Sequence, residues 1–437
     1  MPFTRSAYRV IQSPSPATLL RSPIHSQVPL LWYRYGAHLS RVQVAELVAP
    51  HPHTLNLVHS WLRHHGIPLS STSMTHGGNT LTLTGVSMTQ ADKLLSASYE
   101  VYRHVKTNET IVRTIGYSLP AVLHGHVWTV APTTHFASQR QRQQSPRKRS
   151  SGATGKLAKA TSGEAVAVLL RHDDSITSPT FLRWLYNTWG YIPAATSRNQ
   201  LAIVGFLEDY PSQTDLAAFM QTYRFDGADA TYITVLINYG NLKYDPINGN
   251  GVGEANLNLQ YAQGIAYPTP LVFYSVGLAG DGWVDWLKSV IDLPRLPQTI
   301  SISYGSEEQE YPIDYTTYVC SLFAHLAIRG VSVLASTGND GVGRDCITSD
   351  GTLRFSPNFP ATCTCAFVFG LRAVHKQGYI FLTTATYFRR SLYHRRWRNN
   401  SLPARDRGRD VRRRFLGPLP TPALPGASRT LLPSGPR

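Results

Sequence analysis

The chain has few cysteines, few methionines and few charged residues. Among 437 residues there are four Cys and four Met, and Asp, Glu, Lys and Arg together make up 16%. No Cys-x-x-Cys pair occurs, which argues against a zinc site, so we predict no metal ligands among the cysteines. No run of about 18 apolar residues occurs either, so no membrane-spanning helix is expected. Low charge with 11% aromatic residues suits a secreted globular protein better than a disordered one.

The net charge of +16 is concentrated in two segments. Residues 366–437 contain fifteen Lys and Arg against two Asp, and residues 139–159 contain seven Lys and Arg and no acid. The other residues together carry a small negative charge. The basic linker has no interleaved aromatic residues to stack on bases. We therefore expect a solvated basic tail and no nucleic-acid partner, with nucleic-acid binding through that tail as a minor alternative.

Three features bear on the location of the protein. Residues 1–30 form an atypical N-terminus with prolines throughout and no apolar core, so no signal peptide is readable. Cys346 and Cys363 flank a short loop that contains proline and are the candidate disulfide, which would suit an oxidising compartment. The triplets that begin at Asn108 and Asn399 are glycosylation sequons.

Residues 31–136 predict a compact α+β unit. Residues 80–84 alternate with period two, as a half-buried strand does, and Thr89 is the candidate N-cap of a helix over 89–95. We expect a small sheet backed by two helices. Helical spacing also covers 42–49 and 54–64, and strand alternation also covers 99–105 and 111–117.

Residues 137–165 predict a linker of Gln, Ser, Gly, Arg and Lys with almost no apolar content. It includes Arg147-Lys-Arg149. An exposed connector of this kind is where proteolysis concentrates, so a processing site and a simple flexible connector both remain open.

Residues 166–365 alternate strands with helices, which predicts a parallel sheet with right-handed crossovers. Residues 201–206 form a near-continuous apolar run, as a strand buried on both faces does. After Cys365 the periodicity fades, and we predict that 366–437 is a disordered basic tail. Expected strands are 201–206, 232–237, 270–275, 299–303 and 331–335, and expected helices are 214–223, 253–264, 283–291 and 314–329, the last ending at Gly330.

Three polar segments fall where predicted strands and helices meet. Glu254 and Asn258 are four residues apart on a predicted helix and share one face. Ser303-Tyr304-Gly305 follows one strand, and Ser336-Thr-Gly-Asn339-Asp340-Gly follows the next. An open α/β sheet binds ligands at the carboxyl ends of its strands. A simpler reading makes Glu254 a carboxylate at a helix N-terminus, and Asn339 and Asp340 turn formers.

Together these segments resemble the catalytic core of the sedolisin (serine-carboxyl) peptidases, of the fungal tripeptidyl-peptidase type. The N-terminal unit resembles the pro-kumamolisin-like activation pro-domain of that family. The resemblance covers 31–136 and 170–365. In the pro-domain it rests on Tyr35-Gly-Ala-His-Leu-Ser40, Val48-Ala-Pro-His-Pro52, Tyr117-Ser-Leu-Pro120 and Val130-Ala-Pro-Thr-Thr134.

The resemblance implies a subtilisin-like α/β parallel sheet preceded by a small α+β pro-domain. It implies an extracellular zymogen that cleaves polypeptides at acidic pH, with the pro-domain bound to the catalytic domain and the protein expected to be a monomer. It also implies calcium as a cofactor. In the family, Asp side chains and backbone carbonyls near the C-terminus form the calcium site. The calcium ligands are not found here, because Asp406 and Asp410 lie among arginines.

The resemblance also assigns roles to residues. Glu254 is the general base to a serine, and the family places an Asp at position 258, where this chain has Asn258. An amide can orient Glu254 but supplies no negative charge. Asn339 occupies the position of an oxyanion-stabilising Asp, and an Asn side chain can donate that hydrogen bond at any pH. Ser303, Tyr304 and Gly305 correspond to the segment that lines the substrate cleft, where backbone pairs with an extended peptide.

The expected serine segment, Gly-Thr-Ser, does not occur in the sequence. We therefore expect an incomplete sheet from a C-terminally truncated relative, without ordinary peptidase activity as written. The alternative is an inactive relative that binds peptides.

Overall fold

The computed structural model describes a set of ranges that leaves several gaps in the chain. The predicted linker with Arg147-Lys-Arg149, the sequon asparagines Asn108 and Asn399, and Asp340, Asp406 and Asp410 lie outside the described residues. The described residues are 8–12, 36–75, 77–103, 110–135, 177–194, 197–207, 209–240, 253–277, 280–339, 346–347, 351–363, 367–371 and 382–384.

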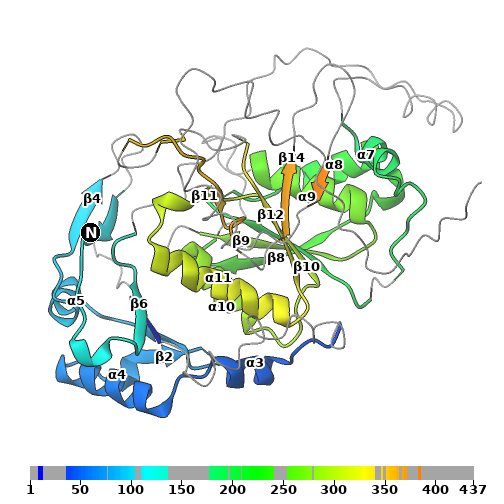
Figure 1. The fold of residues 1–437 in the computed structure, drawn as a ribbon. Helices are drawn as coiled ribbons and strands as arrows, with labels where there is room; N and C mark the ends of the chain where they lie inside the picture. Colours follow the sequence, from blue (N-terminus) through cyan, green and yellow to red (C-terminus); the bar gives the residue numbers. More distant parts are fainter. Residues whose placement is uncertain are drawn as a thin grey trace, which may run out of the picture. The chain divides into compact units, whose positions relative to one another are not determined.

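A seven-stranded sheet, in the order β15-β14-β12-β10-β7-β9-β8, forms the larger unit (Figure 1). Each neighbouring pair from β14 to β8 is parallel, and β15 joins β14 in the antiparallel direction. The parallel α/β sheet predicted from the strand and helix alternation is therefore confirmed. The strands are β7 (Leu201–Gly205), β8 (Tyr232–Ile237), β9 (Leu271–Val276), β10 (Thr299–Ile302), β12 (Ser332–Ser336), β14 (Phe367–Leu371) and β15 (Leu382–Thr384).

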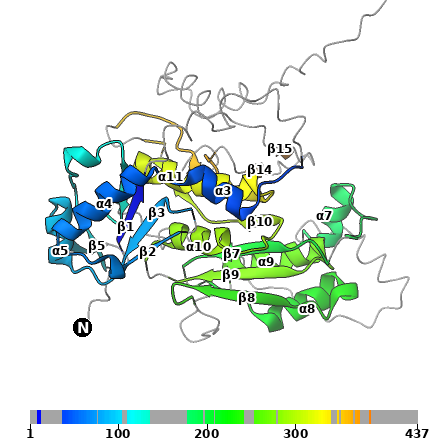
Figure 2. The same cartoon turned by 90° about the horizontal axis from the view of Figure 1, so that it is seen from below.

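Helices cover both faces of this sheet. We call the seven-stranded sheet together with these helices the sheet unit. On one face lie α10 (Gly282–Ile291) and α11 (Ile313–Ile328) (Figure 2). Their side chains Trp286 and Phe323 belong to the core on this face. On the other face, α8 (Gln213–Tyr223) and α9 (Gly253–Ala266) pack against Phe273. Side chains along β7 alternate between these two cores, so the run that reads as continuously apolar serves both faces. In the described part of the chain, no helix is long and apolar enough to cross a membrane.

A four-stranded antiparallel sheet, in the order β2-β3-β1-β6, forms the N-terminal unit with its helices. Its central strand β1 (Tyr8–Gln12) comes from the segment that sequence reasoning set aside as an atypical N-terminus. Five residues carry too weak a pattern to predict a strand whose partners lie about 70 and 120 residues away. The other elements are β2 (Thr72–Met74), β3 (Thr80–Leu83), β6 (Val127–Ala131), the hairpin β4 (Glu100–Arg103) and β5 (Thr110–Arg113), and helices α3 (Arg41–Val48), α4 (Pro52–His64) and α5 (Met88–Leu95).

Strand β3 is buried along its whole length, whereas the sequence predicts a half-buried strand. Its threonine face contacts the sheet unit. The Thr80 hydroxyl lies 2.8 Å from the Tyr318 hydroxyl on α11, and the Lys288 ammonium on α10 donates to the Thr82 hydroxyl at 2.9 Å. Polar and apolar side chains do alternate along β3, as predicted. The polar side chains of β3 contact α10 and α11 instead of water.

The N-terminal unit also contacts the sheet unit through His135, which follows β6. The His135 ring stacks on Tyr311 and Tyr315, with centroids 4.8 Å and 4.6 Å apart. Its Nε2 atom is buried and has no hydrogen-bond partner among the described residues. Burial, and then the charge of Arg113, lower the pKa of His135 to about 3. This histidine is therefore neutral while the contact exists.

Helix ends follow the local capping chemistry. Helix α5 begins after Ser87, whose side chain accepts from the Gln90 N–H in a capping box, so the N-cap is Ser87 and not Thr89. Helix α11 ends at Ile328, and Gly330 follows with a φ of 91°, as the predicted C-cap requires.

The elements of the larger unit that were not predicted from the sequence include α7 (Pro179–Leu185), β14 and β15. Strand β14 pairs with β12, so β12 is not the edge of the sheet. Both β14 and β15 lie inside the segment predicted to be a disordered tail. Each is five residues or shorter and has no turn signals around it, so periodicity alone does not detect them.

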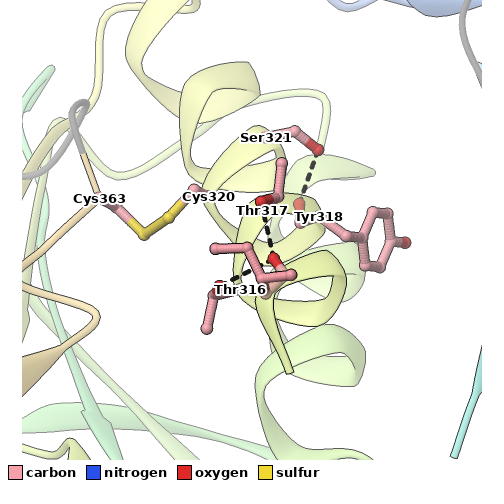
Figure 3. Close-up of a disulfide and its surroundings, with 7 residues drawn as sticks. Thr316, Thr317, Tyr318, Cys320, Ser321 and Cys363 are labelled. Atoms are coloured by element: carbon pink, nitrogen blue, oxygen red, sulfur yellow. Dashed lines mark hydrogen bonds between the residues drawn. A yellow bond between two sulfur atoms is a disulfide. The ribbon is translucent and has the colours of Figure 1, made fainter. Parts of the chain in front are cut away.

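The disulfide joins Cys320 to Cys363, with 5.1 Å between the Cα atoms, and this corrects the predicted Cys346–Cys363 pair (Figure 3). Cys320 lies on α11 beside Thr316 and Thr317, whose hydroxyls donate to the Ile313 carbonyl. Only the packed fold brings this face of α11 against the segment that carries Cys363. The sequence favoured Cys346 because it lies closer to Cys363 along the chain. This prediction was wrong, because the fold brings Cys320 to Cys363 instead.

Candidate active site

The candidate site lies at the carboxyl edge of the sheet, where β7 and β10 end. Strand β7 ends at Gly205, and a side chain at this position would overlap the Phe273 ring, so the backbone passes too closely for any other residue. Two residues later Leu207 adopts a φ of 69°. This turn carries Asp209 back over the edge of the sheet, where it is 1% exposed.

Asp209 is held by donors from two different elements. Its Oδ2 accepts a hydrogen bond from the Ala255 N–H in the first turn of α9, at 3.0 Å. The Tyr304 hydroxyl, just after β10, donates to the same oxygen at 3.1 Å. Burial raises the pKa of Asp209, while the N–H of Ala255 and the hydroxyl of Tyr304 oppose the rise.

Glu254 precedes Ala255 in the same helical turn and is half-buried. Burial raises the pKa of Glu254, the negative charge of Asp209 raises it further, and Asn258 lowers it. Two carboxyl groups this close disfavour double ionisation, which keeps one of them ready to hold a proton. The site can therefore accept and return a proton.

Asn258 lies one helical turn after Glu254, on the same face, as their spacing predicts. It acts on the Glu254 carboxyl, yet its buried Nδ2 has no hydrogen bond of ordinary geometry among the described residues. It supplies no charge. The structure thus brings Glu254 and Asn258 together and adds Asp209, which sequence reasoning missed.

The predicted substrate-binding segment is partly used for internal contacts. Tyr304 directs its hydroxyl to Asp209, and burial raises the pKa of Tyr304 far above 10. A side chain at Gly305 would overlap the Phe359 carbonyl. The next two residues, Ser306–Glu307 (β11), pair with Asn358–Phe359 (β13) in the antiparallel direction. Ser303, Tyr304 and Gly305 keep their assignment to a substrate cleft as a prediction.

Asn339 follows β12 and is exposed. Gly338 before it has a φ of 82°, which explains the glycine in this turn. Because β7, β10 and β12 are parallel neighbours, Asn339 lies at the same edge of the sheet as Asp209 and Tyr304. No described contact joins Asn339 to Glu254, so its role at an oxyanion stays a prediction.

Within the described ranges, no group of three His, Cys, Asp or Glu side chains could hold a metal ion. Calcium sites also use backbone carbonyls, so the calcium implied by the family resemblance stays a prediction. Asp209 itself was detectable in the sequence, because it follows a buried parallel strand directly, and polar residues in that position lie at the ligand-binding edge. Its partners were not, because Ala255 and Tyr304 lie 46 and 95 residues away.

Comparison with known proteins identifies the N-terminal unit. Residues 32–136 match the family model of the pro-kumamolisin activation domain. The chain is 31% identical over 351 residues to the probable tripeptidyl-peptidase SED3 of Arthroderma benhamiae, covering 75% of this chain and 56% of that protein. It is 30% identical over 354 residues to the tripeptidyl-peptidase SED2 of Arthroderma otae, covering 76% and 57%. The chain spans a little over half the length of the curated relatives it matches.

Among solved structures, the chain matches Pseudomonas sedolisin (serine-carboxyl proteinase) complexed with two molecules of pseudo-iodotyrostatin. That match has a TM-score of 0.36 and 22% identity and covers 46% of this chain and 55% of the other. The activation-domain match and the two fungal relatives show that this chain belongs to the sedolisin family of peptidases.

Proposed function

We propose that this protein is the zymogen of an extracellular serine-carboxyl peptidase in which Glu254 is the general base. The observation that carries the proposal is the pair of carboxyls, Glu254 and Asp209, at the edge of a parallel sheet, where both have raised pKa values. A raised pKa suits a carboxylate that must take a proton during the reaction. The names of the fungal relatives support release of tripeptides from protein N-termini as the activity.

In the proposed reaction, Glu254 accepts the proton of a serine hydroxyl as the serine oxygen attacks a peptide carbonyl. Glu254 then returns this proton to the amine that leaves when the peptide bond breaks. The Asn339 amide donates a hydrogen bond to the oxyanion formed on the carbonyl oxygen. The N-terminal unit inhibits the sheet unit until it is released, and the contacts through Thr80, Thr82 and His135 support its binding there.

The nucleophile is not assigned among residues 1–437, because none of the serines lies in a Gly-Thr-Ser segment. We therefore propose that residues 1–437 alone retain at most residual catalysis, on the order of 10³–10⁴ over water. The neutral Asn258 beside Glu254 favours a second candidate function, a relative that binds peptides without cleaving them.

The first experiment assays purified 1–437, beside a Glu254→Gln variant, with an amino-terminally free tripeptide that carries a chromogenic leaving group. The assay covers acidic pH, about 4 to 6, where a carboxyl base titrates when its pKa is raised. We expect neither protein to exceed this residual rate, on the order of 10³–10⁴ over the enzyme-free blank. Ordinary turnover that the Gln variant loses would place a working nucleophile inside 1–437 and overturn the proposal of inactivity.

The second experiment translates the genomic sequence downstream of Cys363 in all frames and appends any segment that encodes Gly-Thr-Ser. Once its N-terminal unit is released, the extended protein should cleave the tripeptide substrate, and Glu254→Gln should lower kcat by about 10³-fold or more. Equal activity of the extended protein and its Gln variant would remove Glu254 from the role of base. Tight binding of an uncleaved peptide by 1–437, with no such segment in any frame, would favour the peptide-binding alternative.

A further inference from the structure

Asp209 has a contact pattern that a purely structural role explains only in part. Its Oδ2 accepts two hydrogen bonds, whereas its buried Oδ1 has no partner of ordinary geometry among the described residues. The backbone N–H groups of Glu254 and Tyr210 also act on this carboxyl and lower its pKa. A buried carboxylate oxygen without a donor is costly, and native structures keep such groups where they serve a purpose. Both hydrogen bonds of ordinary geometry go to Oδ2, and the Glu254 N–H that acts on Asp209 places this carboxyl beside the first turn of α9.

The surroundings of Glu254 contain a second polar atom of this kind. The Nδ2 of Asn258 is buried and lacks a partner of ordinary geometry in the described part of the chain. The groups that act on the Glu254 carboxyl are therefore Asp209, which can carry a negative charge, and Asn258, which cannot. Tyr304, a further titratable group among the described residues of the site, donates its hydroxyl hydrogen bond to Asp209.

We propose that Asp209 supplies the negative charge beside Glu254 that Asn258 does not, and that Ala255 and Tyr304 hold Asp209 in place for this role. Asp209 is then a positioning residue that acts through Glu254. The proposal rests on the proposed function of Glu254 as the base. It extends that function, because it moves the acidic partner from the helix that carries Glu254 to the turn after β7.

The geometry fixes this carboxylate on three sides. The close approach at Gly205 fixes the backbone before the turn, the N–H of Ala255 fixes one oxygen from α9, and the Tyr304 hydroxyl fixes the same oxygen from β10. A charge held in this way favours the protonated form of Glu254 and so increases its proton affinity. A higher proton affinity helps Glu254 take the proton of the serine hydroxyl, which Glu254 then gives to the leaving amine.

The test is a carboxyl-carbon NMR titration of Glu254 in intact 1–437 with ¹³C-labelled Glu and Asp. Asp209→Asn keeps an oxygen that can accept from Ala255 and Tyr304 but removes the charge. We expect it to lower the pKa of Glu254 by up to about one unit. Adding Asn258→Asp to that variant returns a charge to the same carboxyl and should raise the pKa of Glu254 again.

The matched control is Asp215→Asn. Asp215 is exposed and also contacts α9, through the Asn256 side-chain amide at 2.7 Å. Removing this charge should leave the pKa of Glu254 unchanged. An Asp209→Asn protein that keeps the native amide spectrum and shows the wild-type pKa for Glu254 would make Asp209 a helix cap only.

The wild-type protein gives an independent readout that needs no variant to fold. Two interacting carboxyls titrate in two macroscopic steps, so the resonances of Glu254 and Asp209 should each respond at both midpoints. A single independent step for Glu254 would overturn the proposal. None of these measurements uses turnover. If the titrations of Glu254 and Asp209 are coupled but the extended protein stays active as a Glu254→Gln variant, Asp209 acts on Glu254 as proposed here. Glu254 is then not the catalytic base.

Discussion

Two parts of the molecule bury ionisable groups, and acid acts on them in opposite directions. At the edge of the sheet, burial raises the pKa values of Asp209 and Glu254. Between the two units, burial lowers the pKa of His135 to about 3. In both places burial favours the neutral form. That form is the protonated one for a carboxyl and the unprotonated one for a histidine.

The sign of each contribution to stability follows from these directions. The folded pKa of His135 lies below the ordinary value of 6.5, so its contact is fully favourable above about pH 6.5 and weakens until the pH falls to about 3. The carboxyl pair binds protons more tightly in the folded state, so its contribution is largest at low pH and is lost as the pH rises. Acid therefore opposes the contact between the units and favours the proposed site.

The charged groups around His135 do not change this conclusion. Arg113 lies close enough to lower the pKa of His135 further, and Asp281 and Asp314 line the same small pocket. The Tyr315 hydroxyl donates to Asp281, so that acid is already hydrogen-bonded.

The largest effect is expected from removing the cross-link that anchors α11, because this helix contacts both regions. Replacing Cys320 and Cys363 by Ala opens a loop with a sequence separation of 43. By the chain-entropy model this should lower the free energy of unfolding by about 4 kcal/mol, at neutral and acidic pH alike. Urea unfolding of the wild-type protein and the variant measures this difference in the free energy of unfolding.

Cys346→Ala is the control for this prediction, since the sequence alone favours Cys346 as the partner of Cys363. A large loss of stability for Cys346→Ala with little for Cys320→Ala would restore the Cys346–Cys363 pairing and contradict the structure.

The next effect is the pH dependence of the contact through His135. A shift from 6.5 to about 3 predicts that local opening becomes about 100-fold more populated at pH 4.5 than at neutral pH. Hydrogen exchange of the β6 amides in intact 1–437 measures this opening. His135→Phe keeps an aromatic ring between Tyr311 and Tyr315 but cannot take a proton, so its opening should change far less with pH. An equally large pH dependence in the Phe variant would assign the effect to other groups.

A smaller effect that does not depend on pH is expected at Tyr318. Tyr318→Phe removes the buried hydrogen bond to Thr80 and should cost about 1 kcal/mol, or about a fivefold increase in opening. Exchange at β3 is the measurement, and the increase should be the same at both pH values. A stronger effect at acidic pH would mean that the two units respond to acid through more than His135.

The smallest effect concerns Asp209 and stability. Asp209→Asn removes the cost of a buried charge, which the wild-type protein bears at neutral pH more than at acidic pH. The free energy of unfolding of the variant, relative to wild type, should therefore rise from acidic to neutral pH by on the order of 1 kcal/mol. A relative stability that falls over this range would mean that the folded state stabilises the charged form of Asp209.

The sequence predicted the helices and strands that have a strong hydrophobic periodicity and depend on residues close together in the chain. The strands β7, β8, β9, β10 and β12, the helices α8 to α11, and the shared face of Glu254 and Asn258 follow from patterns within about 15 residues. Strand β1, the burial of Thr80 and the partner of Cys363 depend on segments that meet only in the folded chain. Asp209 lies between these cases. Its place after a buried strand was visible, but its contacts with Ala255 and Tyr304 were not.

The most direct test of this account is the titration of the Glu254 carboxyl in intact 1–437. We expect the pKa of Glu254 to lie above that of an exposed glutamate, and its titration curve to respond also to the ionisation of Asp209. A single-step curve with a midpoint at or below the ordinary value of about 4.3 would contradict it.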